Sequence, residues 1–428
     1  MDITVLIWVA LFGLLFLGVP IFVALGASTV LVLFLSPTPM SIIPLDLFKV
    51  AEMFPLLAVP AFILAGSLME KGDVAAQIVE FCELLVGRVR GGLGIVTILG
   101  CMFFAAIIGS GPGTVAAMGS LMIPSMMRRG YSVDYAAGVC STGGTLGILI
   151  PPSNPMILYG VIANVSITSL FVAGIIPGIV VGTVLCLTAY GVARKKGFGG
   201  SDKKVSLKDI GRCFVRNFFS LFTPVLILGG IYSGIFTPVE ASCVAVFYAL
   251  FLGIFVNKAL NWPNFVDAMR ITILSVATMM IVVGVSMLFG HFLTLYKVPH
   301  KLTTMLLSLT NDGTIVLYLI VLFLFFVGMF MDSLATIVIL APILLPVTNS
   351  FGIDPLFFGI LWVMANEIAL LSPPLGPNLF IAMNLTGISL ERAVKAILPF
   401  TVALIVTIFF FVAFGENLVL WLPRLLAK

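Results

Sequence analysis

Long apolar runs follow one another along this chain, separated by short breaks that contain glycine, proline or charged residues. A helix needs about 20 consecutive apolar residues to cross a membrane. Residues 3–35 are too long for one crossing, and the prolyl break Gly18-Val19-Pro20 is expected to divide them into two short spans. The pattern predicts an all-α protein that crosses a membrane many times. Further spans are expected at residues 55–69, 131–163, 170–192, 217–231, 240–256, 271–290, 356–385 and 394–414.

The composition agrees with a membrane protein. Of the 428 residues, 61% are hydrophobic and only 9% are charged, whereas soluble proteins contain about 25% charged residues. The start of the chain lacks the basic region of a signal peptide, so the first run is interpreted as mature structure. The six cysteines show no Cys-x-x-Cys spacing, so neither a zinc site nor a disulfide framework is expected. The net charge of +4 is small, and no nucleic-acid partner is expected.

The segment Ile150-Pro-Pro-Ser-Asn-Pro155 interrupts the long apolar run at residues 131–163. Proline removes a backbone donor and clashes with the preceding turn, so a helix must break here. In lipid, each freed backbone group costs several kcal/mol, so the break must be buried in protein or line a polar cavity. Secondary transporters bind substrates and ions at such broken helices. A proline-kinked helix without a ligand is the alternative.

A second break, Ser372-Pro-Pro-Leu-Gly-Pro-Asn378, repeats the prolines of the first. Paired interruptions at matching positions of two halves are the best indication in a sequence of a transporter site. The two halves of the chain therefore form an internal repeat. The following pairs are each separated by 222 residues: Pro151 and Pro373, Pro152 and Pro374, Pro155 and Pro377, and Pro177 and Pro399.

Two other apolar runs are predicted to form re-entrant hairpins. The first covers residues 92–127, with Gly109-Ser-Gly-Pro-Gly-Thr114 at its tip, and the second covers residues 314–347, with Met331-Asp-Ser333 at its tip. Each arm is short for a crossing. The first tip lacks the Gly-Lys-Ser/Thr of a phosphate-binding loop. Gly109 and Gly113 also fit a small-xxx-small packing pattern, which stays an alternative.

The distribution of basic residues predicts the orientation. Residues 194–216 contain eight of the 22 lysines and arginines and are therefore expected to be cytoplasmic. Counting crossings from this linker places both termini in the periplasm and the two halves in opposite orientations, as an inverted repeat. The expected fold has about ten transmembrane helices, two hairpins and two proline-broken helices, with interfacial helices at 73–86 and 261–270. An elevator-type transporter has a scaffold domain and a moving transport domain. The scaffold is expected to comprise residues 1–91 and 217–310, and the transport domain residues 92–193 and 311–428.

Several polar residues are candidates for a site at these breaks. Asp332 lies between two long apolar runs, and acids inside a membrane are costly and usually functional. The alternative is a hydrogen bond that caps the following helix. Glu367, beside Asn366, precedes the second break and has similar weight. For Asn154 and Asn378, capping a half-helix and contacting a ligand both stay open.

No lysine or arginine lies within the breaks or hairpin tips. An anionic substrate would therefore be attracted by helix N-termini and by bound cations, which favours coupling to Na⁺ through neutral oxygens. The only histidines, His291 and His300, lie on the outer flank, which disfavours proton coupling through histidine. An intramembrane hydrolase lacks a base for Ser110 and a second acid for Asp332. A channel or passive scaffold is a further alternative.

Five motifs carry a resemblance to a known family. The chain resembles, over essentially its whole length, the large membrane subunit of tripartite ATP-independent periplasmic (TRAP) transporters. The motifs are Pro60-Ala-Phe-Ile-Leu-Ala-Gly-Ser-Leu-Met69, Gly91-Gly-Leu-Gly94, Ile150-Pro-Pro-Ser-Asn-Pro155, Gly234-Ile-Phe-Thr-Pro-Val-Glu240 and Ser372-Pro-Pro-Leu-Gly-Pro377.

The resemblance implies Na⁺-driven import of an organic anion across the bacterial inner membrane by an elevator movement. It implies two partners, a four-helix small membrane subunit and a periplasmic substrate-binding protein. Sialic acid and four-carbon dicarboxylates are the leading substrates, and the chain looks slightly more similar to the sialic-acid branch. The family is also similar to stand-alone Na⁺-coupled dicarboxylate symporters, which are the alternative function.

The resemblance also implies site residues, by analogy with the hairpin tips and broken helices of those symporters. The implied Na⁺ ligands are Ser110, Gly111, Thr114, Pro151, Asp332, Ser333, Thr336, Ser372 and Pro373. The implied substrate contacts are Thr145, Ser153, Asn154, Gly376 and Asn378.

Overall fold

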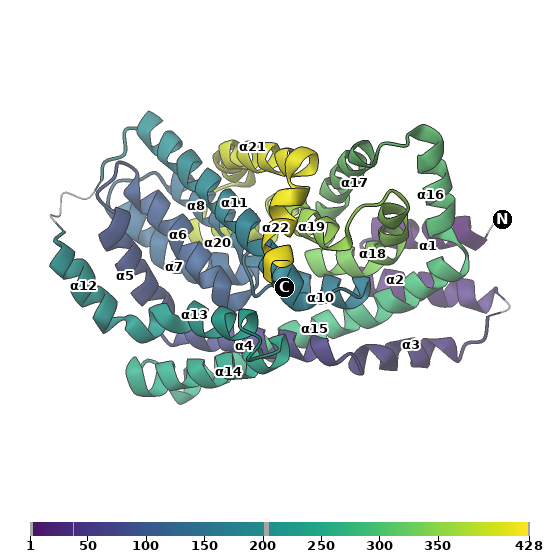
Figure 1. Ribbon diagram of the computed structural model, residues 1–428, viewed down its shortest axis with the longest axis horizontal. Coiled ribbons are helices and arrows are strands. Elements are labelled where there is room, and N and C mark those ends of the chain that lie inside the picture. Colours follow the sequence, from purple (N-terminus) through teal and green to yellow (C-terminus); the bar gives the residue numbers. More distant parts are fainter. Residues whose placement is uncertain (1–2, 37, 201–204, 427–428) are drawn as a thin grey trace.

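The structure, a computed structural model, describes residues 3–36, 38–200 and 205–426, and all the regular elements in these ranges are helices (Figure 1). Seven of the described helices are long and apolar enough to cross a membrane, or eight if the bent pair α12–α13 is one span. The predicted all-α polytopic class is therefore confirmed. α1 (Ile3–Phe16) and α2 (Ile21–Phe34) are separate 14-residue helices, divided near Gly18 as expected. The number of about ten crossings stays a prediction.

The hairpin, the broken span and the long helix that follows occur in the same order in both halves. The first half continues with α3 (Ile42–Ala51), a short 3₁₀ turn (Phe54–Leu57), α4 (Ala58–Lys71), α5 (Val74–Val86), α6 (Gly92–Ile108), α7 (Gly111–Arg128), α8 (Val133–Gly143), α9 (Leu146–Leu149), α10 (Asn154–Ala163) and α11 (Ile167–Lys195). The second half contains α12 (Leu207–Arg216), α13 (Phe218–Tyr232), α14 (Pro238–Phe251), a π-helical turn (Leu252–Val256), α15 (Trp262–Leu295), α16 (Val298–Leu309), α17 (Gly313–Gly328), α18 (Ser333–Ser350), α19 (Pro355–Ala369), α20 (Pro377–Thr386), α21 (Leu390–Phe414) and α22 (Glu416–Leu426).

The helix boundaries preserve the spacing of 222 residues found in the sequence. α7 and α18 begin at Gly111 and Ser333 and end at Arg128 and Ser350, so both ends match this spacing. The hairpins α6–α7 and α17–α18 and the broken spans α8–α10 and α19–α20 thus occupy equivalent positions. The inverted orientation of the two halves stays a prediction.

The structure corrects one assignment of an interfacial helix. Residues 261–270 are not a separate helix but the first turns of α15, which continues to Leu295. Asp267 and Arg270 give this stretch an interfacial appearance, but after Pro263 no proline follows and the first glycine is Gly284, so nothing breaks the helix. At the repeat spacing, α15 corresponds to α3 and α4 together, and α16 corresponds to α5.

Of the helices that precede the hairpins, α3, α4, α14 and α15 lie along the lower part of Figure 1. There α15 packs against α2, α3 and α4, and α4 packs against α14. The hairpins and broken helices fill the middle of the molecule. There the two halves interlock, because α10 packs against α18 and α20 packs against α7 and α8. α22, which the hydrophobic pattern did not predict, follows Gly415 and packs against α11. The assignment of scaffold and transport domains stays a prediction.

Candidate functional site

The tip of the first hairpin contacts the first broken helix. Gly109 ends α6 with φ +67°, a conformation that favours glycine. Ser110 caps α7, its hydroxyl accepting a hydrogen bond from the Gly113 N–H (3.4 Å), and Thr114 donates to the Ser110 carbonyl (2.8 Å). The Asn154 N–H donates to the Gly109 carbonyl (3.2 Å) and so joins the break to the tip.

The first break is buried. The Ser153 hydroxyl caps α10 by accepting from the Met156 N–H (3.3 Å), and it donates to the Ile148 carbonyl (2.5 Å). Pro151 is buried, and Asn154, only 6% exposed, has a side-chain oxygen without a hydrogen-bond partner. The Ser153 hydroxyl is therefore occupied by hydrogen bonds within the break. The side-chain oxygen of Asn154 is free to accept a hydrogen bond or to contact a ligand.

The second hairpin tip separates an exposed acid from buried hydroxyls. Asp332 is exposed, and its carboxylate accepts from the Leu334 N–H (3.0 Å) at the start of α18. This is the capping contact that the sequence left open as an alternative. Thr336 is buried, donates to the Ser333 carbonyl (2.8 Å) and lies 3.5 Å from the Asn366 side-chain oxygen. The buried Ser333 hydroxyl has no hydrogen-bond partner.

The second break lies partly at the surface. Ser372 and Pro373 are half-buried, and the Leu375 N–H donates to the Met329 carbonyl (3.1 Å), close to the repeat positions of Asn154 and Gly109 but not at them. Gly376 takes φ +27° just before α20. Asn378 is fully buried, and its amide donates to the Ser141 carbonyl (3.3 Å). Each hairpin therefore contacts the break of its own half through a backbone hydrogen bond.

Glu367 is the most unusual side chain of the site. It is fully buried in α19, and neither carboxyl oxygen has a hydrogen-bond partner. Thr145 lies beside it, but the Thr145 hydroxyl donates to the Thr142 carbonyl (2.8 Å). Glu367 and Asn366 are absent from the ligands that the family resemblance implies, although an acid and an amide just before a helix break were a visible signal.

Five buried side chains at the breaks, the second hairpin tip and the end of α19 have polar atoms without partners. Buried polar groups in proteins are nearly always hydrogen-bonded, and an unpaired one costs free energy. These unpaired groups make the breaks, the second hairpin tip and the end of α19 the candidate binding site. We call these five residues the buried polar set: Asn154, Ser333, Asn366, Glu367 and Asn378.

Residues 8–416 match the model of the family described as "Tripartite ATP-independent periplasmic transporter, DctM component". This chain belongs to that family. Its members are transporter components, so the hydrolase alternative has no support in the family. The predicted resemblance to the large TRAP subunit is confirmed.

Individual relatives carry several substrate names. A C4-dicarboxylate TRAP transporter large permease protein of Pseudomonas aeruginosa is 38% identical over 89% of this chain and 88% of its own length. A sialic acid TRAP transporter large permease protein of Vibrio cholerae is 34% identical over 96% of both chains. These identities give no support to a closer resemblance to the sialic-acid branch.

A third relative is longer than this chain. An isethionate TRAP transporter permease protein, DctMQ, of Oleidesulfovibrio alaskensis is 38% identical over 90% of this chain, which spans only 61% of that protein. Among solved structures, the YdaH transporter of Alcanivorax borkumensis matches with a TM-score of 0.65 and 14% identity, covering 86% of this chain and 88% of the other. That likeness shows a shared fold.

The oxygens around the breaks fit an alkali cation. Within the described ranges, no three His, Cys, Asp or Glu side chains come together. Neutral oxygens are available instead, from Ser110 and Thr114 at the first hairpin tip and from Ser333, Thr336 and Asn366 near the second break. A hydroxyl that donates its hydrogen still has lone pairs for a cation. Unwound carbonyls and side-chain oxygens of this kind bind Na⁺ in secondary transporters.

Gly147→Ala is expected to destabilise the first hairpin. A Cβ at Gly147 would lie 2.5 Å from the Ser110 carbonyl oxygen and 2.7 Å from the Thr114 hydroxyl, so the backbone of the tip would have to shift. Overpacking of this kind costs about 1–3 kcal/mol. Thermal unfolding of the purified protein should show a lower midpoint, with Gly191→Ala, which meets nothing within 4 Å, as the control. Equal midpoints for the two variants would contradict this contact.

Proposed function

We propose that this chain is the large permease subunit of a Na⁺-coupled TRAP transporter that imports an organic anion, most simply a carboxylate. The observation that carries the proposal is the buried polar set on the broken helices and second hairpin. Unpartnered oxygens and amides at such breaks are suited to a polar substrate and to cations.

The absence of basic residues supports the cation coupling. No lysine or arginine occurs in the tip segments 109–114 and 331–333 or in the breaks 150–155 and 372–378. The charge of an anionic substrate must therefore be balanced by helix N-termini and bound cations. α10 and α20 both begin at these breaks, which places two helix N-termini there.

The class of substrate is inferred from the relatives. Their names specify C4-dicarboxylate, sialic acid, 2,3-diketo-L-gulonate and isethionate, all of which are organic anions. We propose that Asn154 and Asn378, whose side-chain oxygens are unpartnered, contact the substrate together with Ser153, Thr145 and Gly376.

The proposed transporter has two further protein components. The DctMQ relative is longer than this chain, which leaves room in that protein for a further membrane segment. We propose that a four-helix small membrane subunit performs this part here and that a periplasmic binding protein delivers the substrate. The interlocked hairpins and broken helices would move as one transport body against the helices that precede them. The packing of α10 on α18 and of α20 on α7 supports this elevator movement.

Uptake into proteoliposomes tests the proposal. The chain, its small subunit and a binding protein loaded with substrate are reconstituted with an inward Na⁺ gradient. Electrogenic uptake is expected with Na⁺ and at least tenfold less with K⁺ in its place. Full activity in K⁺, driven by a proton gradient alone, would contradict Na⁺ coupling. Proteoliposomes without the binding protein are the control for delivery.

A further inference from the structure

α12 stands at one edge of the molecule, beside α5, at the left of Figure 1. It begins with a capping box, in which Ser206 and Asp209 satisfy each other's backbone N–H groups, and it ends at Asn217. There the chain bends by 67° into the apolar helix α13. If α13 crosses the membrane, α12 lies close to the plane of the membrane surface.

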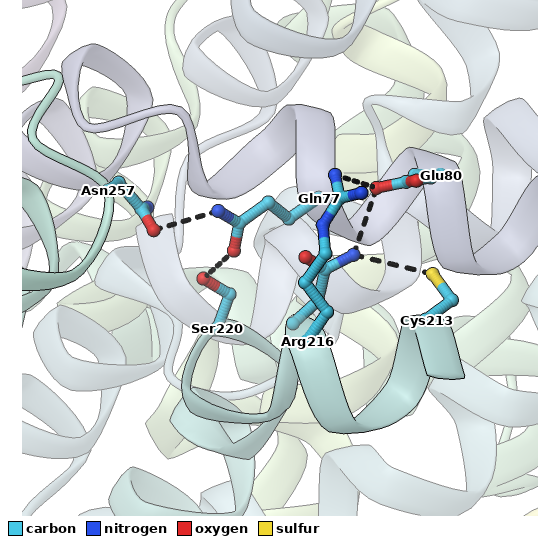
Figure 2. A network of polar contacts seen from close by, with 7 residues as sticks. Gln77, Glu80, Cys213, Arg216, Ser220 and Asn257 are labelled. Atoms are coloured by element: carbon cyan, nitrogen blue, oxygen red, sulfur yellow. Dashed lines mark hydrogen bonds and ion pairs between the residues drawn. The ribbon is translucent and has the colours of Figure 1, made fainter. Parts of the chain in front are cut away.

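A polar network fixes one face of α12 to α5 (Figure 2). The Glu80 carboxylate of α5 accepts from Arg216 (3.1 Å) and from the Asn217 amide (3.0 Å). Asn217 also donates to the Cys213 sulfur (3.4 Å), and Cys213 is buried. The bonding side of α12 is therefore the side of Cys213 and Asn217.

The same network extends to the start of the neighbouring helices. Gln77 of α5 accepts from Ser220 of α13 (2.5 Å) and donates to Asn257 (2.7 Å), which in turn donates to the Gly72 carbonyl (2.7 Å). These contacts hold α5, α12 and α13 together. The rotation of α12 about its own axis is thereby determined, and the residues on its other side must face outward.

The outward side of α12 combines positive charge with apolar surface. Lys208 and Arg212 are exposed one helical turn apart and have no acidic partner among the residues that the structure describes. They line an open hollow of about 630 Å³ together with Gly211, Val215 and Arg216. Leu207 and Val215 beside them are 86% and 75% exposed.

The nearby acids whose positions the structure describes all have other partners. Asp209 is engaged in the capping box, and Glu80 already accepts from Arg216 and Asn217. Glu83, one turn further along α5, forms an ion pair with Arg129. Among the described residues, Lys208 and Arg212 therefore form no ion pair, and both are exposed.

We propose that this face of α12 binds the headgroup of an anionic phospholipid. Lys208 and Arg212 hold the phosphate, and the acyl chains lie against Leu207, Phe214 and Val215, which are all exposed. Basic residues on an amphipathic helix attract anionic lipids, and apolar residues on the adjoining flank enter the acyl boundary. The apolar flank favours a lipid over a soluble phosphate, because a free anion would leave that surface in water.

A lipid bound to α12 would affect the helices that lead into the first hairpin. α12 is joined through Glu80 to α5, and α5 leads directly into the first hairpin. A lipid on α12 would therefore stabilise the fixed end from which the hairpin extends. The proposal does not depend on which substrate is carried.

Lipid binding to the purified full chain tests the inference. Native mass spectrometry would compare phosphatidylglycerol with phosphatidylcholine of the same acyl chains, and with inorganic phosphate as a competitor. We expect preferential binding of phosphatidylglycerol. Lys208→Gln combined with Arg212→Gln should weaken it at least tenfold, because both phosphate ligands are lost while glutamine preserves the helix. The control, Lys195→Gln with Lys196→Gln, removes two exposed charges from the end of α11 and should change binding less than twofold.

Three outcomes would overturn the proposal. The first is equal binding of phosphatidylglycerol and phosphatidylcholine. The second is equal binding of phosphatidylglycerol by the α12 variant and the α11 control. The third is displacement of phosphatidylglycerol by inorganic phosphate at equal concentration. A further variant, Leu207→Gln with Val215→Gln, separates a lipid from a soluble anion. It should weaken phosphatidylglycerol binding severalfold, and unchanged binding would show that the site recognises phosphate alone.

Discussion

Glu367→Gln is expected to reduce substrate uptake at least 100-fold while the protein still folds and assembles. The wild-type carboxyl group is fully buried, and its two oxygens have no hydrogen-bond partner. A buried, unpaired carboxylate costs several kcal/mol, so a cation or a proton must neutralise it during the cycle. Glutamine keeps the shape of the side chain but cannot balance a cation. A 100-fold loss corresponds to about 2.7 kcal/mol.

Uptake and thermal stability would be measured on the same reconstituted samples. Glu416→Gln, which removes an exposed acid from α22, is the matched control and should transport normally. Loss of uptake with an unchanged or higher unfolding midpoint supports a role for the Glu367 charge in transport. Normal uptake by Glu367→Gln would show that this carboxyl group stays protonated and only fills space.

The breaks in the helices were predictable from the sequence because their causes are local. Pro151 and Pro373 lack a backbone donor, and Gly18 takes a positive φ between α1 and α2. The hairpin tips were predictable for the same reason. Ser110 and Asp332 both cap the helix that follows, and both precede it at the same position in the repeat.

Contacts between distant segments were not predictable. Thr336 and Asn366 are 30 residues apart, and only the packing of α18 on α19 brings them within 3.5 Å. The interlocking of the two halves, with α10 on α18 and α20 on α7, depends equally on tertiary packing. The break expected after Arg270 is absent because polarity alone does not end a helix.

The position of Asp332 shows the limit most clearly. Its isolation among apolar residues predicted a buried site residue, but the side chain is exposed and caps α18 through the Leu334 N–H. The neighbouring Ser333 and Thr336 are the buried members of this tip. Sequence spacing identifies the tip but not which of its side chains points inward. The role of Asp332 in ion binding stays a prediction, and it can be separated from capping by experiment.

Asp332→Asn is expected to lower transport at least tenfold and to weaken the apparent affinity for Na⁺. Asp332 belongs to the same hairpin tip as Ser333 and Thr336, and its negative charge would stabilise a cation bound there. A tenfold loss corresponds to about 1.4 kcal/mol. Asparagine is nearly as good a helix cap as aspartate, so the loss of capping alone should cost little.

Asp354→Asn is a matched control, because Asp354 caps α19 in the same way, accepting from the N–H groups of Leu356 (2.8 Å) and Phe357 (3.4 Å). Uptake would be measured for both variants over a series of Na⁺ concentrations. If Asp332 contributes its charge to a cation site, only Asp332→Asn shifts the Na⁺ dependence to higher concentrations. If both variants transport like the wild type, Asp332 is a cap and nothing more. The proposed Na⁺ site near the second break would then use only neutral oxygens, those of Ser333, Thr336 and Asn366, because Asp332 would act only as a helix cap.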